Sequence, residues 1–408
     1  MRAPARWTRR GWILCLAALS AACTQGGLRV AELDTPVPAG AAKQFLATVD
    51  GQLVVGWVEP VGGDSQAIRL ATRSGAGWSA PRTVVQVPFL VDAQMVALGG
   101  HGLGLTWMVT SKHGTEQDPI EGHDVYLARS GDGGATWTAP VRANREATPS
   151  MKESPTLGAF ADGGMAVAWS DMRTIRFTPP ATPDGDWGMS GLTSFVGTTL
   201  DAEGRVGAEV VLDDDFCDCC VPALATSGAD VLLAYREHRT GNVREIAVLR
   251  WSADAHTAST EVSRDHWVLE GCPGVGPAIG RSGDGIGLLW FTAADERPRV
   301  QVAFSHDEGG SFSAPLAVDT AAPFMVLGMT MLDRESGVAS WLAGGADGQQ
   351  LRLARVDRQG GVGAPLLLSA PDSTGFAALA TAGLGDSIFV AWTEAGGTRS
   401  RLMVVRGG

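Results

Sequence analysis

The sequence lacks runs of basic residues, and its acidic residues outnumber its basic ones by 44 to 32. A chain without a basic tract has no electrostatic match for a phosphate backbone, so nucleic acid is excluded as the expected partner. Apolar residues also lack sustained helical spacing, which argues against a helical bundle. Glycine and proline are plentiful, with 54 and 21 copies, and they supply turns. The composition therefore favours an acidic, turn-rich β protein.

The N-terminus combines basic residues with a short apolar run. "MRAPARWTRR" carries four arginines and no acid, "GWILCLAALSAA" follows, and Cys23 comes next. This order is typical of an export signal and too short for a membrane span, and we prefer it to a buried N-terminal helix. The segment Ser20-Ala21-Ala22-Cys23 resembles a bacterial lipobox, in which Cys23 would carry lipid. Ser20 replaces the usual leucine, which leaves ordinary signal cleavage as the alternative.

The expected mature chain is strongly acidic and has few cysteines. We expect a signal over residues 1–22 and an exported chain over 23–408, held by lipid in the bacterial envelope, either in the periplasm or at the outer membrane. Loss of four arginines leaves 28 basic and 44 acidic residues, a formal charge of −16. Cys217, Cys219, Cys220 and Cys272 remain, an even number for an oxidising compartment.

One short pattern repeats along the chain, an apolar run that closes on an aromatic residue. Its closing residues are Trp57, Trp107, Trp169, Tyr235, Trp290, Trp341 and Trp392, spaced by 50, 62, 66, 55, 51 and 51 positions. Each unit contains further strand-like segments and turns, as expected for the four-stranded blade of a β-propeller. We predict one all-β propeller domain over 23–408, with seven blades or, alternatively, six. The strand in "GLRVAELDTPVP" would complete the last blade, which lacks its own fourth strand.

Two short segments resemble the Asp-box of bacterial sialidases, Ser-x-Asp-x-Gly-x-Thr-Trp. The first has Ser130, Asp132, Gly134 and Trp137 at the key positions, and the second has Ser305, Asp307, Gly309 and Phe312. The resemblance implies a sialidase-like propeller over nearly the whole mature chain. It also implies that both boxes join third to fourth strands, on the face away from the ligand site. Their hydrogen bonding and packing explain them as structural elements.

This placement predicts which loops form the functional face. Loops from strand two to strand three, and from strand four to the next blade, would lie opposite the Asp-boxes. The cysteine turn "DDDFCDCCVP" would precede the first strand of blade four, and Cys272 would precede that of blade five. The long loops place further candidate ligand-binding or catalytic residues on the same face: His123, Asp124, Asp171, Arg173, Arg236, Glu237, Arg244 and Glu245.

The resemblance raises the question of sialidase chemistry. In that family three arginines bind the sugar carboxylate, a tyrosine paired with glutamate is the nucleophile, and an aspartate is the acid or base. Here the early Arg-Ile-Pro motif is absent, and the only two tyrosines, Tyr126 and Tyr235, are not in the late blades. We therefore expect no tyrosine nucleophile, so any hydrolysis of the exo-sialidase type would lack its usual centre.

Charged residues of the long loops still suggest an anion site. Arg173, Arg236 and Arg244 could bind an anion, with Asp171 or Glu237 as the catalytic acid or base. An equally favoured alternative is that Arg236–Glu237 and Arg244–Glu245 are ion pairs that tie neighbouring loops together.

The four cysteines allow two arrangements. Adjacent Cys219 and Cys220 cannot bond to each other without strain, so Cys217–Cys220 and Cys219–Cys272 would be the natural disulfides. The alternative is a thiolate site for Cu(I) or Zn²⁺.

Three classes of function follow. The protein could recognise or cleave a glycan or small anionic ligand, bind a metal at its cysteines, or dock other proteins without catalysis. We expect a monomer that touches the membrane only through its lipid.

Overall fold

The computed structural model describes residues 23–25 and 28–407, except positions 76, 116–117, 147–149, 179–187, 191, 218, 228, 254, 346–347, 370–376 and 394–399. The predicted export signal, residues 1–22, lies outside these described residues. No helix in the described part of the chain is long and apolar enough to cross a membrane. Strands dominate, and the one helix described is the 3₁₀ turn η1 (Ala294–Glu296).

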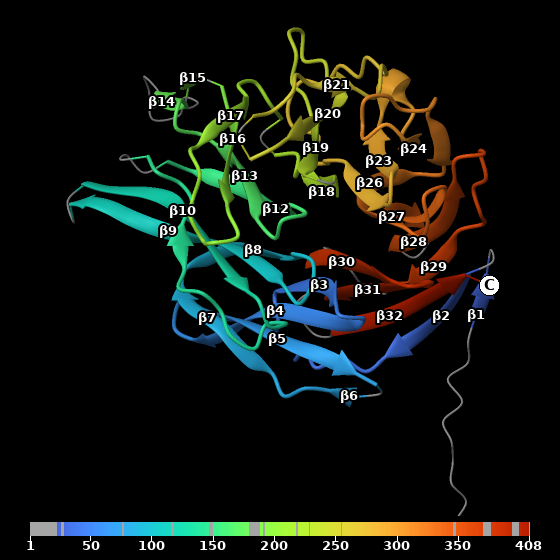
Figure 1. Ribbon diagram of the computed structural model, residues 1–408. Coiled ribbons are helices and arrows are strands. Elements are labelled where there is room, and N and C mark those ends of the chain that lie inside the picture. The colour runs from blue at the N-terminus through green and yellow to red at the C-terminus, as the bar shows by residue number, and fades with distance from the viewer. Residues whose placement is uncertain are drawn as a thin grey trace, which may run out of the picture.

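Seven antiparallel sheets form a ring, which confirms the predicted seven-bladed propeller (Figure 1). Blade one contains β3 (Lys43–Val49), β4 (Gln52–Gly62) and β5 (Ser65–Ser74), with both β6 (Gly77–Trp78) and β7 (Arg82–Pro88) paired to β5. Blade two contains β8 (Leu90–Ala97), β9 (Leu103–Thr115), β10 (Asp118–Ser130) and β11 (Val141–Arg142). Blade three contains β12 (Lys152–Ala159), β13 (Met165–Asp171), β16 (Ser194–Leu200) and β17 (Val210–Asp213). A separate hairpin, β14 (Arg176–Thr178) and β15 (Gly188–Ser190), extends from it.

The remaining blades follow the same order. Blade four contains β18 (Ala223–Ser227), β19 (Asp230–Arg236), β20 (Ile246–Trp251) and β21 (Thr260–Glu261). Blade five contains β22 (Ala278–Ser282), β23 (Gly285–Thr292), β24 (Arg299–Ser305) and β25 (Leu316–Asp319). Blade six contains β26 (Pro323–Met331), β27 (Ser336–Gly345), β28 (Gly348–Asp357) and β29 (Leu366–Ser369). Blade seven contains β30 (Ala377–Leu384), β31 (Ser387–Thr393) and β32 (Ser400–Gly407).

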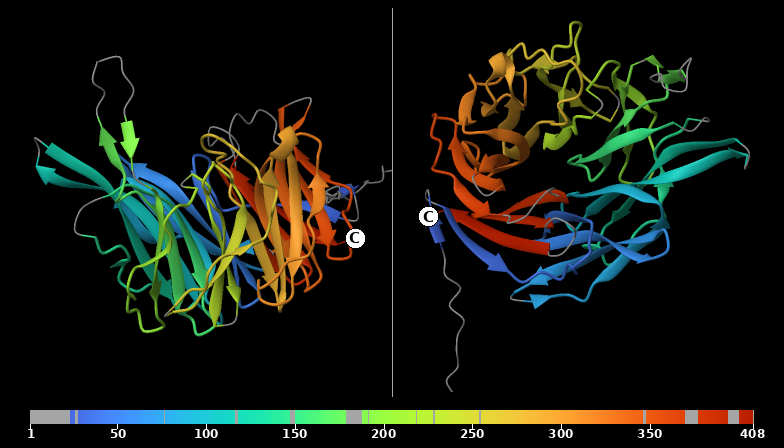
Figure 2. Two further views of the ribbon diagram at one scale, coloured as in Figure 1. Left: turned by 90° about the horizontal axis from the view of Figure 1, so that it is seen from above. Right: turned by 180° about the vertical axis from the view of Figure 1, so that it is seen from behind.

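The N-terminal strand closes the ring. β2 (Leu28–Leu33) pairs antiparallel with β32, in a register that joins Leu28 to Gly407 and Leu33 to Leu402. This confirms the predicted pairing of the two chain ends, which Figure 2 shows from behind. β1 (Cys23–Gln25) adds a further short strand outside β2. The first strand of each blade contacts the first strands of its neighbours around the whole ring.

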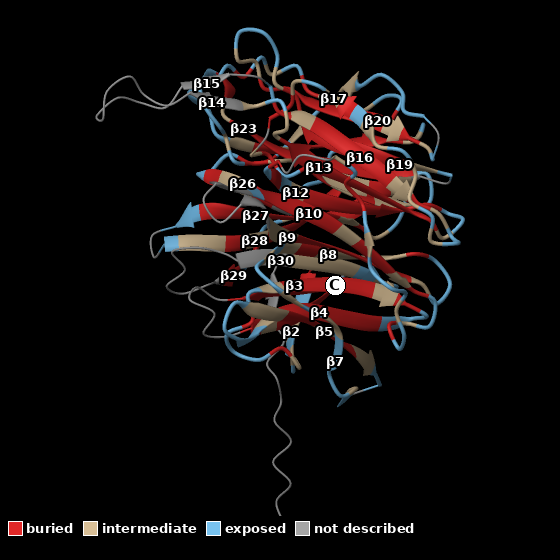
Figure 3. Ribbon diagram, turned by 90° about the vertical axis from the view of Figure 1, so that its left-hand side faces the viewer, coloured by how far each residue is buried: buried red, intermediate tan, exposed pale blue. Residues whose placement is uncertain are grey.

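The repeating aromatic residues lie in the second strand of every blade. Each is no more than 1 % exposed and packs among the apolar side chains between sheets. Buried residues occupy the middle of the sheets, whereas exposed residues lie mainly in loops (Figure 3). The aromatic repeat therefore marks the residues that pack between the blades. Burial of each large apolar side chain stabilises the fold by roughly 1.5–3 kcal/mol or more.

The two predicted Asp-box segments form matching turns between third and fourth strands. Asp132 accepts hydrogen bonds from Thr136, from the amide at 2.8 Å and from the hydroxyl at 2.6 Å. Asp307 accepts the same pair from Ser311, at 2.9 and 2.6 Å. The Thr136 hydroxyl and amide lower the pKa of Asp132 to about 2. Gly134, at φ +85°, adopts a conformation that favours glycine, so these contacts explain the turn structurally.

Ring closure makes a stability prediction about Leu28. This side chain is 1 % exposed and packs with Trp392 and Val405, whereas neighbouring Arg29 is exposed. We expect Leu28→Ala to lower the free energy of unfolding by about 2–5 kcal/mol, because it leaves a cavity in the closing seam. Arg29→Ala, the matched control, should change it by less than about 0.5 kcal/mol. Equal denaturant midpoints for the two variants would contradict the closing role of β2.

Candidate functional site

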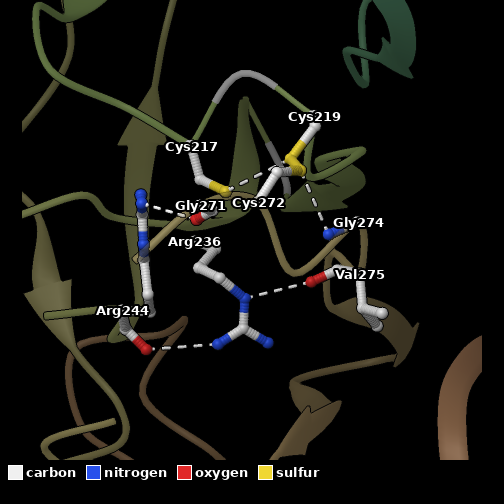
Figure 4. Close-up of a disulfide and its surroundings, with 8 residues drawn as sticks. All are labelled: Cys217, Cys219, Arg236, Arg244, Gly271, Cys272, Gly274 and Val275. Atoms are coloured by element: carbon white, nitrogen blue, oxygen red, sulfur yellow. Dashed lines mark hydrogen bonds between the residues drawn. A yellow bond between two sulfur atoms is a disulfide. The ribbon is translucent and has the colours of Figure 1, made fainter. Parts of the chain in front are cut away.

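Four cysteines meet where blades three, four and five come together. The turn after β17 carries Cys217, Cys219 and Cys220, and the connection from β21 to β22 carries Cys272. Cys219 and Cys272 form a disulfide with their Cα atoms 6.3 Å apart (Figure 4). The bond ties together two inter-blade connections that are 53 positions apart in sequence.

The other two cysteines remain free thiols. Cys217 and Cys220 are buried, and Cys217 Sγ lies 3.8 Å from Cys219 Sγ. The sulfurs of Cys217, Cys219 and Cys220 all lie within 4.8 Å of one another. The structure therefore contains one of the two disulfides that the sequence allowed, together with a buried dithiol beside it.

Arg236 is a buried cation behind the dithiol. Its side chain is 1 % exposed and donates hydrogen bonds to three carbonyls, those of Val275 at 3.0 Å, Arg244 at 3.1 Å and Phe291 at 2.7 Å. The guanidinium also lies 5.0 Å from the centre of the Trp267 ring. No described carboxylate forms an ion pair with it. This burial leaves no guanidinium surface for a ligand arriving from solvent, contrary to the role predicted from sequence.

The Cys217 thiol and nearby cations stabilise a thiolate at Cys220. A hydrogen bond from Cys217 lowers the pKa of Cys220, burial opposes this effect, and the charges of Arg236 and Arg244 reinforce it. The same hydrogen bond, together with burial, raises the pKa of Cys217. Of the two thiols, Cys220, next to the guanidinium of Arg236, is therefore the more acidic.

A pocket of about 290 Å³ opens beside the cysteines. Its lining includes Leu192, Asp215, Cys217, His238, Arg244 and Cys272. Arg244 is 8 % exposed and donates from Nη2 to the Gly271 carbonyl at 2.9 Å, whereas its Nε has no hydrogen-bond partner among the described residues. His238 contacts Asp215 at 2.7 Å and Asn242 at 3.0 Å. Sequence reasoning missed Asp215 and His238, because only the folded blades bring their two loops together.

The predicted glutamates have structural partners instead of lining this pocket. Glu237 accepts a hydrogen bond from Ser259 at 2.9 Å and pairs with Arg239, not with Arg236. Burial raises the pKa of Glu237. Glu245 is 1 % exposed and accepts hydrogen bonds from Ser263 Oγ at 2.9 Å and the His266 amide at 2.8 Å. The two neighbouring ion pairs expected from sequence are therefore replaced by other contacts.

A second polar network lies in blades two and three and holds the remaining predicted residues. Arg173 forms a two-point contact with Asp171, at 2.9 and 2.7 Å, and also reaches Glu209 at 3.0 Å. Asp124 contacts Arg142 at 2.8 Å. His123 Nδ1 contacts the carbonyl of the fully buried Lys152. The three predicted arginines thus have separate partners, and they do not share one anion site.

Asp171 is poorly suited to donate a proton. Burial alone would raise its pKa, but hydrogen bonds from Arg173 and Trp169 outweigh burial and hold the pKa below its ordinary value. The Trp169 indole N–H donates to Asp171 at 2.9 Å. The carboxylate therefore stays ionised and fixes Arg173 and Trp169 in place.

The fold and the site define a seven-bladed β-propeller with a cysteine-lined pocket on one face. No protein-family model matches the chain, and no curated protein matches its sequence. Among solved structures, an ulvan lyase of polysaccharide lyase family PL25 is 12 % identical, with a TM-score of 0.51 over 85 % of this chain and 93 % of the lyase. This similarity shows the fold.

Sialidases are also among the structures found. NanB sialidase from Streptococcus pneumoniae is 12 % identical, with a TM-score of 0.43 over 92 % of this chain and 69 % of NanB. Trypanosoma rangeli sialidase is 13 % identical, with a TM-score of 0.43 over 80 % of this chain. The chain matches 54 % of the trypanosomal enzyme's length.

The buried carboxylate of Asp171 predicts a pH-dependent loss of stability. Asp171→Asn should lower the unfolding free energy at pH 7, because it removes the charged partner of Arg173. The loss should not exceed about 3 kcal/mol, because the Arg173 side chain is 32 % exposed and water screens part of the ion pair. The folded pKa is depressed, so this contribution is complete above the unfolded pKa of about 4 and is lost as the pH falls through the folded pKa. The stabilities of wild type and variant, measured by denaturant titration, should therefore begin to approach each other as the pH falls below about 4 and should meet below the folded pKa.

The control for this experiment is Asp284→Asn, because Asp284 is 51 % exposed and pairs with Arg334 at 3.4 Å. It should change stability by less than about 0.5 kcal/mol at any pH. A gap between wild type and Asp171→Asn that stays constant through strong acid would contradict the depressed pKa.

Proposed function

We propose that this protein is an exported propeller that binds an anionic saccharide in the pocket beside the cysteines. The observation that carries the proposal is Arg244, a pocket-lining cation whose printed hydrogen bond goes to the Gly271 carbonyl and whose Nε has no partner among the described residues. A largely buried guanidinium without a described carboxylate partner favours an anion, and a carboxylate or sulfate group fits its planar fork.

The surroundings of Arg244 support a sugar as the carrier of that anion. The Asp215 carboxylate, which His238 holds through its Nδ1, offers a polar contact for hydroxyl groups, whereas Leu192 supplies an apolar surface at the same pocket. Pockets of this kind, with few oriented polar groups on a rigid scaffold, are typical binding sites. The ulvan lyase structure holds a ligand containing glucuronic acid and sulfated rhamnose. A shared fold alone does not transfer that ligand, so the proposal depends on Arg244.

The proposal is limited to binding, without sialidase-type hydrolysis, because Tyr235 is not placed to act as a nucleophile. This residue is 1 % exposed, donates its hydroxyl proton to Asp213 at 2.8 Å and packs against Phe195 and Phe216. Burial raises its pKa, which keeps the phenol protonated. A protonated, enclosed phenol cannot attack a sugar in the pocket.

We also propose that the chain is exported and held at the envelope by lipid on Cys23. The basic and apolar N-terminal segments and the lipobox-like Ser20–Cys23 segment support this part of the proposal. Cys23 lies in β1, on the outer edge of blade seven, away from the cysteine turn in sequence and blade order.

The role of Arg244 predicts selective loss of binding. Arg244→Met should weaken binding of a glucuronate-containing oligosaccharide by at least about 10-fold, because hydrogen bonds to a charged group contribute about 1.5–3 kcal/mol. Arg264→Met is the control, since Arg264 is 80 % exposed on a neighbouring loop and should change affinity less than 2-fold. Titration calorimetry with acidic and neutral oligosaccharides of equal length measures both effects. Equal affinity of wild type and Arg244→Met for the acidic sugar would refute the proposed site.

The buried phenol predicts no turnover of aryl sialosides. We expect wild type and Tyr235→Phe to release the aryl group at the same background rate, because neither offers a nucleophile to the pocket. A fluorogenic sialoside assay, with an active sialidase as positive control, measures the release. Clear turnover by wild type that disappears in Tyr235→Phe would overturn this prediction.

A further inference from the structure

Two free thiols in a C-x-x-C spacing face one buried cation. We propose that Cys217 and Cys220 bind a single Cu(I) ion as a two-thiolate site, while the Cys219–Cys272 disulfide beside them stays intact. This inference concerns different atoms from the saccharide contact at Arg244, so either proposal can fail while the other holds.

The sulfur positions suit one shared ion. The Sγ atoms of Cys217, Cys219 and Cys220 lie within 4.8 Å of one another. Metal–sulfur bonds of about 2.3 Å on either side of one ion would separate two sulfurs by up to about 4.6 Å. Cys217 and Cys220 therefore need only small side-chain movements to share a metal. The bridge sulfur of Cys219 lies 3.8 Å from Cys217 Sγ (Figure 4).

The charge around the thiols favours a complex with one negative charge. Arg236 is 1 % exposed and is bonded to three carbonyl groups, and no described carboxylate pairs with it. A buried charge without a counter-charge is costly. Two thiolates and one Cu(I) carry a net charge of −1, so the loaded site would neutralise the Arg236 guanidinium. Both thiol protons leave to solvent as the ion binds.

The available ligands select the ion. Structural Zn²⁺ takes four ligands, but the disulfide withdraws Cys219 and Cys272 and leaves two thiols. Soft thiolates favour Cu(I), which accepts two sulfur ligands, and hard ions such as Ca²⁺ and Mg²⁺ require several oxygens. The metal-ligating cluster found among the described residues contains cysteines only.

The pocket gives the ion a route to the site. Cys217 and Cys272 both line it, so the pocket leads from solvent to Cys217, which is itself 2 % exposed. Cys220 is 0 % exposed and lies deeper. An incoming ion would therefore meet Cys217 first and then Cys220.

The test measures Cu(I) binding by the purified full chain, without oxygen and without thiol reductant, in competition with a coloured Cu(I) chelator. A free-thiol count first establishes that the disulfide is intact. We expect one tightly bound Cu(I) and no tightly bound Zn²⁺. Cys217→Ser and Cys220→Ser should each weaken Cu(I) binding at least 100-fold. Every variant keeps the N-terminal cysteines, so differences between variants report the cluster.

The matched control is the double variant Cys219→Ser/Cys272→Ser, which removes both bridge sulfurs and adds no new thiol. It should keep Cu(I) affinity within 10-fold of wild type. Thermal unfolding identifies any variant that does not fold, and X-ray absorption of Cu(I)-loaded wild type then decides the question without substitutions. We expect two sulfur neighbours and no others. Nitrogen or oxygen neighbours, or full binding by both single variants, would overturn the proposal.

Discussion

Five of the seven blades share one interaction, a buried aromatic side chain whose polar tip donates a hydrogen bond to a carboxylate. An enclosed N–H or O–H without an acceptor costs about 1–3 kcal/mol, so these partners stabilise their blades. Trp392 is an exception, because its buried Nε1 has no partner among the described residues. Trp57 and Trp169 find theirs two residues along the same strand. Tyr235, Trp290 and Trp341 reach back to a carboxylate that precedes their own blade: Asp213, Asp265 and Asp319, at 2.8, 3.3 and 2.6 Å.

The cysteine site depends on two of these contacts. Asp213 ends β17 directly before the cysteine turn, and Tyr235 holds it from blade four. Asp265 lies in the connection that leads to Cys272, and Trp290 holds it from blade five. Both connections are therefore anchored near their cysteines, which explains why Cys219 and Cys272 meet across a whole blade. The aromatic repeat thus determines both the packing of the ring and the position of the sulfurs.

Periodic features could be predicted from the sequence, and charge partners could not. The aromatic spacing located the second strand of all seven blades, and the unpaired N-terminal segment located the closing strand. Arg236 illustrates the limit, because at the end of a strand it was expected to face a ligand and instead lies 1 % exposed behind the thiols. Its partners are the backbone carbonyls of two loop residues, Arg244 and Val275, and of Phe291 in β23, and a sequence pattern does not record which carbonyls a guanidinium will meet. The hairpin of β14 and β15 was missed for a related reason, since strands of three residues are too short to carry a periodic signal.

The Cys219–Cys272 bond has a topological consequence for blade four. Its four strands, from Ala223 to Glu261, all lie inside the covalent loop that this bond closes. Blade four is thus the one blade of the described ring whose strands all lie within a chain segment closed by a disulfide. A protease that cuts a loop of this blade would leave two fragments joined through sulfur, and only a reducing agent would release them. The cysteine-lined face would therefore stay assembled after such a cut.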